Sequence, residues 1–160
     1  MNRHRTADYE FQALRLSKPR NLELSLALEC QVALSHNARV LDLSSFNHLR
    51  LLGGFSVIEV RHTSQSLFDP LGRPAAAQTL IRGKGFHIVL REGMDESELS
   101  ISLYHEVLEA ATVAAENPPE SVLEFNEGDF EEAARSAHTR YGIASPTTLN
   151  EMLESFGFKD

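Results

Sequence analysis

The sequence predicts an α+β fold in which helices pack on a small, three-stranded and mostly antiparallel sheet. Three observations support this prediction. Two β-rich runs are joined by the three residues Gly83-Lys84-Gly85, which is typical of a hairpin. Another run of β-branched and apolar residues precedes them, directly after a glycine pair. Stretches with apolar residues at helical spacing lie on both sides of these runs.

Length and composition favour one globular domain. The chain has 160 residues, which suits a single hydrophobic core, so we expect a polar tail at 1–20 and one domain at 21–160. The formal net charge of −8 argues against non-specific nucleic-acid binding, which needs a basic surface. A single cysteine, Cys30, cannot form an intrachain disulfide, and no apolar stretch reaches the ~20 residues that span a bilayer. We therefore expect a cytoplasmic protein that binds neither nucleic acid nor membrane.

The first half of the domain should contain one helix and one strand. Asn21 can cap a helix that runs to about Ser35. Residues 40–43 are expected to form a short strand or turn. Residues 55–61 alternate as a strand does. The prolines and glycine in 62–77 predict a long loop, a feature that is often functional in a compact domain.

The centre of the chain should form a hairpin and then a long helix. The hairpin is expected from residues 78–82 and 86–90. Asp95 can cap the helix while Glu98 reaches back to the cap, and the Asn-Pro-Pro sequence after Glu116 ends it.

Two further helices should follow. Asp129 repeats the capping pattern and is expected to open a helix that ends near Tyr141. Ser145 and Pro146 suit the start of a last helix, which should end before Gly157.

The long helix carries the motif His105-Glu106-Val107-Leu108-Glu109. Residues four apart share a helix face, so His105 and Glu109 should project together, and both can bind a divalent metal. Glu106 lies one residue further round, where it can take a proton from a water on that metal. This is the division of labour in the His-Glu-x-x-His motif, with a glutamate in place of the second histidine. The spacing predicts a metal site with Glu106 as general base.

A third ligand is expected from the next helix. Glu131 is the first choice, because that helix must pack back on the motif helix and carries alanines that allow close approach. Glu127 and Glu132 are the alternatives. A carboxylate near a helix start is also favoured by the helix dipole alone, without any metal.

Together with His105-Glu106-x-x-Glu109, the segment Glu131-Glu132-Ala133-Ala134-Arg135-Ser136-Ala137 resembles the ImmA/IrrE family of metallopeptidases. The resemblance covers residues 20–145 in layout, and the motif helix and the helix after it in residues. It implies a minimal zincin-like domain that binds zinc, or manganese, through His105, Glu109 and Glu131, with Glu106 as general base. It also implies a peptidase that acts on a protein partner such as a repressor.

The sequence departs from the family pattern in ways that bear on activity. Glu109 stands in place of the second histidine, and the Asn-x-Phe part of the second helix is missing. Two carboxylates neutralise more of the ion's charge, so the ion would acidify its water less, and manganese would gain relative to zinc. A peptidase also needs an oxyanion stabiliser, for which His138 and Tyr141 are the candidates.

Two other interpretations of the chain stay open. In the first, the same scaffold is a non-catalytic module that holds a partner segment in the groove beside the long helix, by strand addition at the sheet edge. The 62–77 loop, with Leu67 and Phe68, would then be part of the contact. In the second, the chain is a small structural subunit in which His105 and Glu109 make only surface hydrogen bonds.

Overall fold

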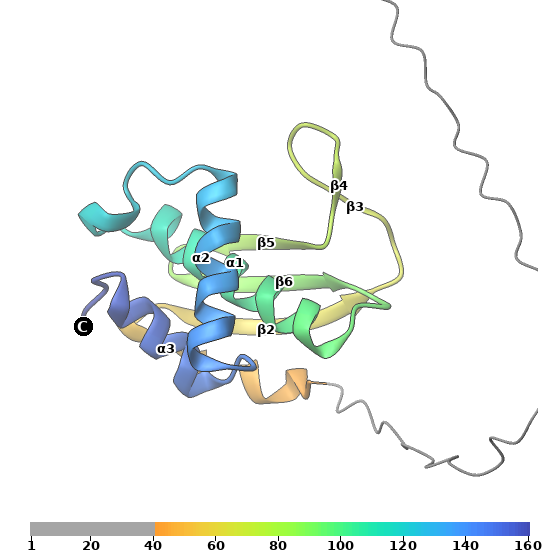
Figure 1. Ribbon diagram of the computed structural model, residues 1–160, viewed down its shortest axis with the longest axis horizontal. Helices are drawn as coiled ribbons and strands as arrows, with labels where there is room; N and C mark the ends of the chain where they lie inside the picture. Colours follow the sequence, from red (N-terminus) through yellow and green to blue (C-terminus); the bar gives the residue numbers. More distant parts are fainter. Residues whose placement is uncertain (1–40) are drawn as a thin grey trace, which may run out of the picture. The chain divides into compact units, whose positions relative to one another are not determined.

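The computed structural model describes residues 41–160 (Figure 1). The expected tail at 1–20 and the expected helix at 21–35 lie outside the described residues, as does Cys30. The described part is a mixed structure with helices α1, α2 and α3, a four-stranded sheet and a separate two-stranded sheet. It therefore has the predicted α+β character, but its main sheet has one strand more than the three we expected.

The main sheet has the strand order β1-β2-β6-β5. Its members are β1 (Leu49–Arg50), β2 (Ser56–Thr63), β5 (Ala77–Arg82) and β6 (Gly85–Arg91). The predicted hairpin is confirmed, since β5 and β6 pair antiparallel and their connection turns at Gly83, which has a φ of +59°. The central strands β2 and β6 run parallel, whereas β1 pairs antiparallel with β2. β5 is therefore one edge of the sheet.

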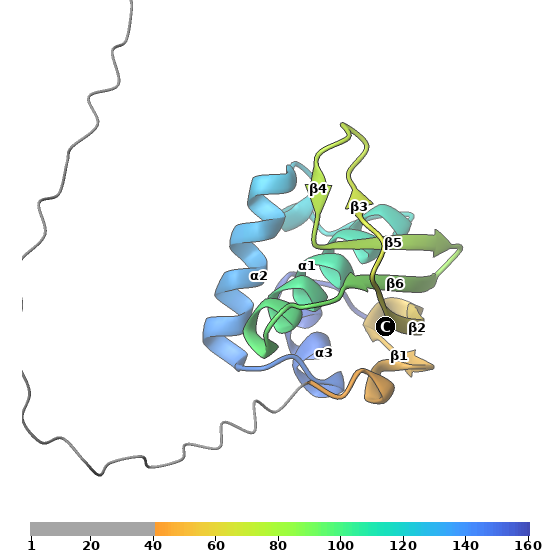
Figure 2. The same cartoon turned by 90° about the vertical axis from the view of Figure 1, so that its right-hand side faces the viewer.

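The segment expected to be one long loop contains a second, small sheet. Strands β3 (Leu67–Phe68) and β4 (Pro74–Ala75) pair antiparallel, and Figure 2 shows them projecting beyond β5. Asp69 holds their turn by accepting hydrogen bonds from two backbone N–H groups, those of Leu71 and Arg73. Earlier in the chain, a strand or turn was expected at 40–43, but residues 41–42 have no regular structure and a short 3₁₀ helix η1 (Leu43–Phe46) begins at Leu43.

The caps of α1 and α3 are those that the sequence predicts. α1 (Glu96–Ala114) begins with a capping box in which the Asp95 and Glu98 side chains exchange hydrogen bonds with each other's backbone N–H. α3 (Pro146–Ser155) is capped by the hydroxyl of Ser145.

The start of α2 (Glu127–Tyr141) differs from the prediction. Its cap is Asn126, and Asp129 occupies the third helical position instead of the cap. The helix therefore begins earlier than expected and includes Glu127.

The helices gather on one side of the sheet. α1 lies against the strands, and α2 lies on the far side of α1 (Figures 1 and 2). Alternate residues of β6 point into the core beneath α1, where Phe86, Ile88 and Leu90 are buried. None of the helices in residues 41–160 has the length and apolar character that crossing a bilayer requires.

Candidate metal centre

The imidazole ring of His105 lies among carboxylates. His105 is 7% exposed. It lies on the part of α1 that faces both the sheet edge and the start of α2. The Nε2 atom lies 3.4 Å from Glu109 Oε2 and 3.3 Å from Glu127 Oε1. One ligand atom from each of these three residues fits within 4.8 Å of the others, so His105, Glu109 and Glu127 could hold a metal ion.

Glu131, the third ligand that the sequence favoured, is not part of this group. Its Oε2 atom lies 3.4 Å from Nδ1 of His105, and its Oε1 atom lies 2.6 Å from Arg135 Nη2. The two ring nitrogens point to different sides of the imidazole, so an ion on Nε2 would lie away from Glu131. The structure brings Glu127, one of the two alternatives, to the position expected for Glu131. The other alternative, Glu132, is exposed and makes no ion pair within residues 41–160.

Glu106 is a buried carboxyl next to this cluster. It is 9% exposed, and the hydroxyl of Thr79 in β5 donates a 2.6 Å hydrogen bond to its Oε2 atom. Burial raises the pKa of Glu106 to about 7, and the hydrogen bond from Thr79 and the charge of His105 only partly oppose that rise. Glu106 can therefore hold or release a proton near neutral pH.

The carboxylates make His105 a stronger base than usual. Burial lowers its pKa, but the hydrogen bond with Glu109 and the charges of Glu106 and Glu127 outweigh burial and raise the pKa to about 8. In the metal-free protein a proton on His105 thus balances part of the negative charge. A divalent cation would replace that proton, because a ligating imidazole must be neutral.

The cluster opens into a cleft of about 470 Å³ between α1 and the sheet edge. One wall is β5, and the β3–β4 hairpin lies at its end. Three apolar side chains that line this cleft are exposed to solvent, Phe68 at 49%, Leu80 at 54% and Val113 at 67%. Exposed apolar side chains around a cleft with ionisable groups are typical of a binding site.

Neither residue considered as an oxyanion stabiliser lines this cleft. The Nδ1 atom of His138 lies 2.9 Å from the hydroxyl oxygen of Ser100, which also accepts the backbone N–H of Ala144. Tyr141, at the end of α2, packs against the core with Arg140 over its ring. His138 therefore helps to fix the turn between α2 and α3, and the structure gives neither residue the predicted place at the metal cluster.

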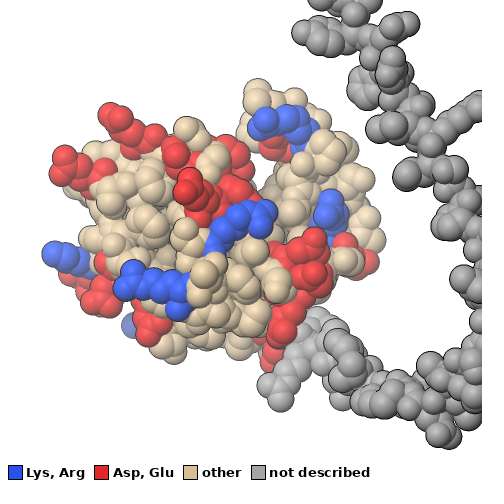
Figure 3. All heavy atoms as spheres, in the orientation of Figure 1, with Lys and Arg blue, Asp and Glu red and all other residues tan. Residues whose placement is uncertain are grey.

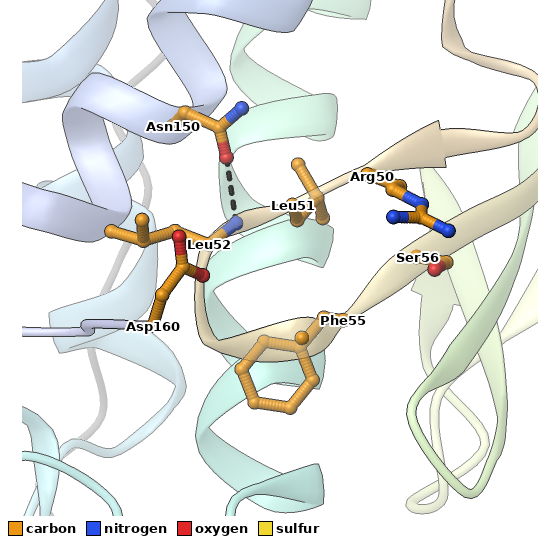
Figure 4. Close-up of a pocket in the computed structure, with 8 residues that line it drawn as sticks. Arg50, Leu51, Leu52, Phe55, Ser56, Asn150 and Asp160 are labelled. Atoms are coloured by element: carbon orange, nitrogen blue, oxygen red, sulfur yellow. Dashed lines mark hydrogen bonds between the residues drawn. The ribbon is translucent and has the colours of Figure 1, made fainter.

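A larger cavity, of about 650 Å³, lies on another part of the molecule (Figure 4). It is bounded by the turn between β1 and β2 and by α3, and in it the backbone N–H of Leu52 donates a 2.8 Å hydrogen bond to Asn150. It contains none of the clustered ionisable residues described above. We take the smaller cleft as the functional candidate, because buried groups with shifted pKa values gather there.

Acidic side chains are spread over the face formed by the helices, with a few basic ones between them (Figure 3). This distribution agrees with the net charge of −8 for the whole chain. In comparisons with known proteins, no family model, no curated protein and no solved structure matched the chain. The resemblance to the ImmA/IrrE family therefore stays a prediction, and the functional argument rests on the geometry of the site.

Proposed function

We propose that this protein is a metal-dependent hydrolase of zincin-like type that cleaves a peptide segment of a protein partner. His105, Glu109 and Glu127 would bind the ion, and Glu106 would act as general base. One observation carries the proposal: three potential ligand atoms lie within 4.8 Å of one another, directly beside a buried carboxyl whose pKa is about 7. A general base works best when its pKa lies near the working pH.

The chemistry would be divided between the ion and the chain. A bound divalent ion would polarise a carbonyl group and acidify a water molecule. Thr79 occupies the Oε2 atom of Glu106, which leaves Oε1 as the oxygen free to accept a proton and pass it to a leaving amine. One imidazole and two carboxylates suit Zn²⁺, and the second carboxylate favours Mn²⁺ more than a two-histidine site would.

The edge strand β5 offers a place for the substrate. It pairs with β6 on one side only, so its other backbone N–H and C=O groups could pair with an extended peptide. Thr79, on this strand, contacts Glu106, so a segment added to β5 would run past the general base. The exposed Phe68, Leu80 and Val113 would receive apolar side chains of that segment.

A non-catalytic binding module is the second candidate function. One observation favours it: within residues 41–160, neither His138 nor Tyr141 lies at the cleft to stabilise an oxyanion. The edge strand and the apolar side chains would then serve to hold a partner segment without cleaving it.

Metal binding and cleavage can be tested separately. The full chain, stripped with a chelator, should bind one equivalent of Zn²⁺ or Mn²⁺ in a calorimetric titration. It should then cleave members of a fluorogenic peptide library, and the chelator should abolish that cleavage. Glu106→Gln should lose cleavage but keep the bound ion, since Glu106 is not a ligand in this arrangement.

Glu132→Gln is the matched control, because it makes the same change at an exposed residue outside the cluster. The control should bind the ion and cleave as the unaltered protein does. Absence of stoichiometric binding of either ion would refute the metal site. Bound metal with peptide binding but no cleavage would leave the binding module as the function.

A further inference from the structure

Carboxylates contact both nitrogens of the His105 ring. On the Nε2 side are Glu109 and Glu127, the candidate ligands. On the Nδ1 side is Glu131, whose Oε2 atom lies 3.4 Å from that nitrogen. The metal proposal uses only the first side, so the contact with Glu131 needs its own explanation.

Arg135 holds Glu131 in place. The two residues are one turn apart on α2, and Arg135 Nη2 lies 2.6 Å from Glu131 Oε1. Both side chains are substantially exposed, at 64% for Arg135 and 43% for Glu131, and an exposed ion pair of this kind contributes little to stability. The main effect of this pair is therefore on the position of Glu131. Arg135 fixes one carboxylate oxygen of Glu131, while the other faces His105.

The backbone beneath Glu131 is also well fixed. α2 packs closely on α1 through three buried alanines, Ala133 at 8% exposure, Ala134 at 0% and Ala137 at 4%. Small side chains at a helix contact let the two backbones approach, so the distance between α1 and α2 has little freedom to vary. The position of Glu131 relative to His105 is set by this packing.

We infer that Glu131, held by Arg135, is a positioning residue that accepts the Nδ1–H of His105 and so directs the Nε2 lone pair toward the metal. This inference rests on the proposed metal site. A carboxylate on the second nitrogen of a ligating imidazole fixes the tautomer and the ring orientation and makes the ligand more basic. Glu131 is then needed for tight metal binding without touching the ion.

The first test compares metal affinities in the full chain. Zn²⁺ affinity is measured by competition with a chelating indicator for the unaltered protein, Glu131→Gln, the ligand variant Glu127→Gln and the control Glu132→Gln. Loss of such a carboxylate typically weakens metal binding about 10- to 100-fold, and we expect a loss in that range for Glu131→Gln. Glu132→Gln should stay within about twofold, because that residue is exposed and outside the cluster. Arg135→Gln should give a smaller loss in the same direction.

The second test reads the histidine ring directly. Proton NMR of the metal-free protein at pH 6, where His105 carries a proton on both nitrogens, should show a downfield Nδ1–H resonance. Glu131→Gln should move this resonance upfield, while Glu132→Gln should leave it in place. A purely structural role for Glu131 would leave the Nδ1–H resonance unchanged. The inference is overturned if Glu131→Gln and Glu132→Gln behave alike in both measurements. It is also overturned if Glu131→Gln removes binding as completely as Glu127→Gln, which would make Glu131 a ligand.

The two proposals can fail separately. If the unaltered protein binds no Zn²⁺, the proposed metal site is wrong. The Nδ1–H resonance of His105 in the metal-free protein still decides whether Glu131 positions the ring.

Discussion

Replacing Glu106 with glutamine should stabilise the metal-free protein above pH 5. Glu106 is 9% exposed, and burial is the main reason why its pKa rises from 4.5 to about 7. A carboxyl group whose pKa is higher in the folded chain binds its proton more tightly there than in the unfolded chain. Its contribution to stability is therefore present below pH 4.5 and is lost as the pH rises through 7. Glutamine has no proton to lose, so the variant avoids this loss.

The size of the effect follows from the shift. A rise from 4.5 to about 7, at about 1.4 kcal/mol per pH unit, corresponds to about 3 kcal/mol once both states are ionised. The charge of Glu106 also raises the pKa of His105, so its removal weakens protonation of His105 and takes back part of the gain. About 3 kcal/mol is thus the upper end of the expected stabilisation at pH 8. At pH 4.5 the same comparison should give a difference near zero.

Urea denaturation followed by circular dichroism would measure this effect. The free energy of unfolding is determined with chelator present at pH 4.5, 6, 7 and 8 for the unaltered chain, Glu106→Gln and Glu132→Gln. The prediction concerns how the difference in free energy of unfolding between Glu106→Gln and the unaltered chain changes with pH. Any effect of glutamine on packing is the same at every pH and does not contribute to this change. Glu132→Gln should show no such change. If the advantage of Glu106→Gln stays constant or shrinks as the pH rises, the reasoning about burial is refuted.

Three further outcomes are expected. Zn²⁺ affinity measured by equilibrium dialysis should fall up to tenfold for each pH unit below about pH 8, because His105 must lose its proton to bind the ion. An affinity that does not change with pH would contradict this. Leu153→Ala should lower the free energy of unfolding by about 2–5 kcal/mol in urea denaturation, since Leu153 is fully buried, and a loss below 1 kcal/mol would be inconsistent with that burial. Ser145→Ala should cost about 0.5–2 kcal/mol in the same measurement, and no cost would show that its hydroxyl does not cap α3.

Features that depend on neighbouring residues could be predicted from the sequence. The capping box of Asp95 and Glu98 spans four residues, and the turn of the β5–β6 hairpin has only two, Gly83 and Lys84, since Gly85 already pairs with Arg82. The start of α3 at Ser145 is equally local. In each case the residues that decide the structure are contiguous, so the local pattern was sufficient.

Features that depend on distant pairing could not be predicted. β1 has only two residues, Leu49 and Arg50, and exists because β2 pairs with it. The parallel alignment of β2 with β6 is a property of the fold, since either strand alone is compatible with both directions. The β3–β4 pair is likewise too short to show alternation.

The candidate site shows the same division. His105, Glu106 and Glu109 could be found because helical spacing alone brings them together. The sequence favours Glu131 over Glu127 because it predicts a helix that opens at Asp129. The structure begins this helix at the Asn126 cap, which brings Glu127 into its first turn.

The hydrogen-bond partner of Glu106 could not be predicted from the sequence. Thr79 precedes Glu106 by 27 residues and stands on a different element. Only the packing of β5 against α1 brings the two side chains together.

The hydrogen bond between Thr79 and Glu106 couples the sheet edge directly to the proposed general base. Thr79 belongs to β5, the strand to which a partner segment would add, and its hydroxyl lies 2.6 Å from the carboxylate. A partner that stiffened β5 would also restrict the Thr79 side chain, and with it the orientation of Glu106. Binding of a partner at the sheet edge would then change the orientation of Glu106 through this one hydrogen bond, without a rearrangement of the helices.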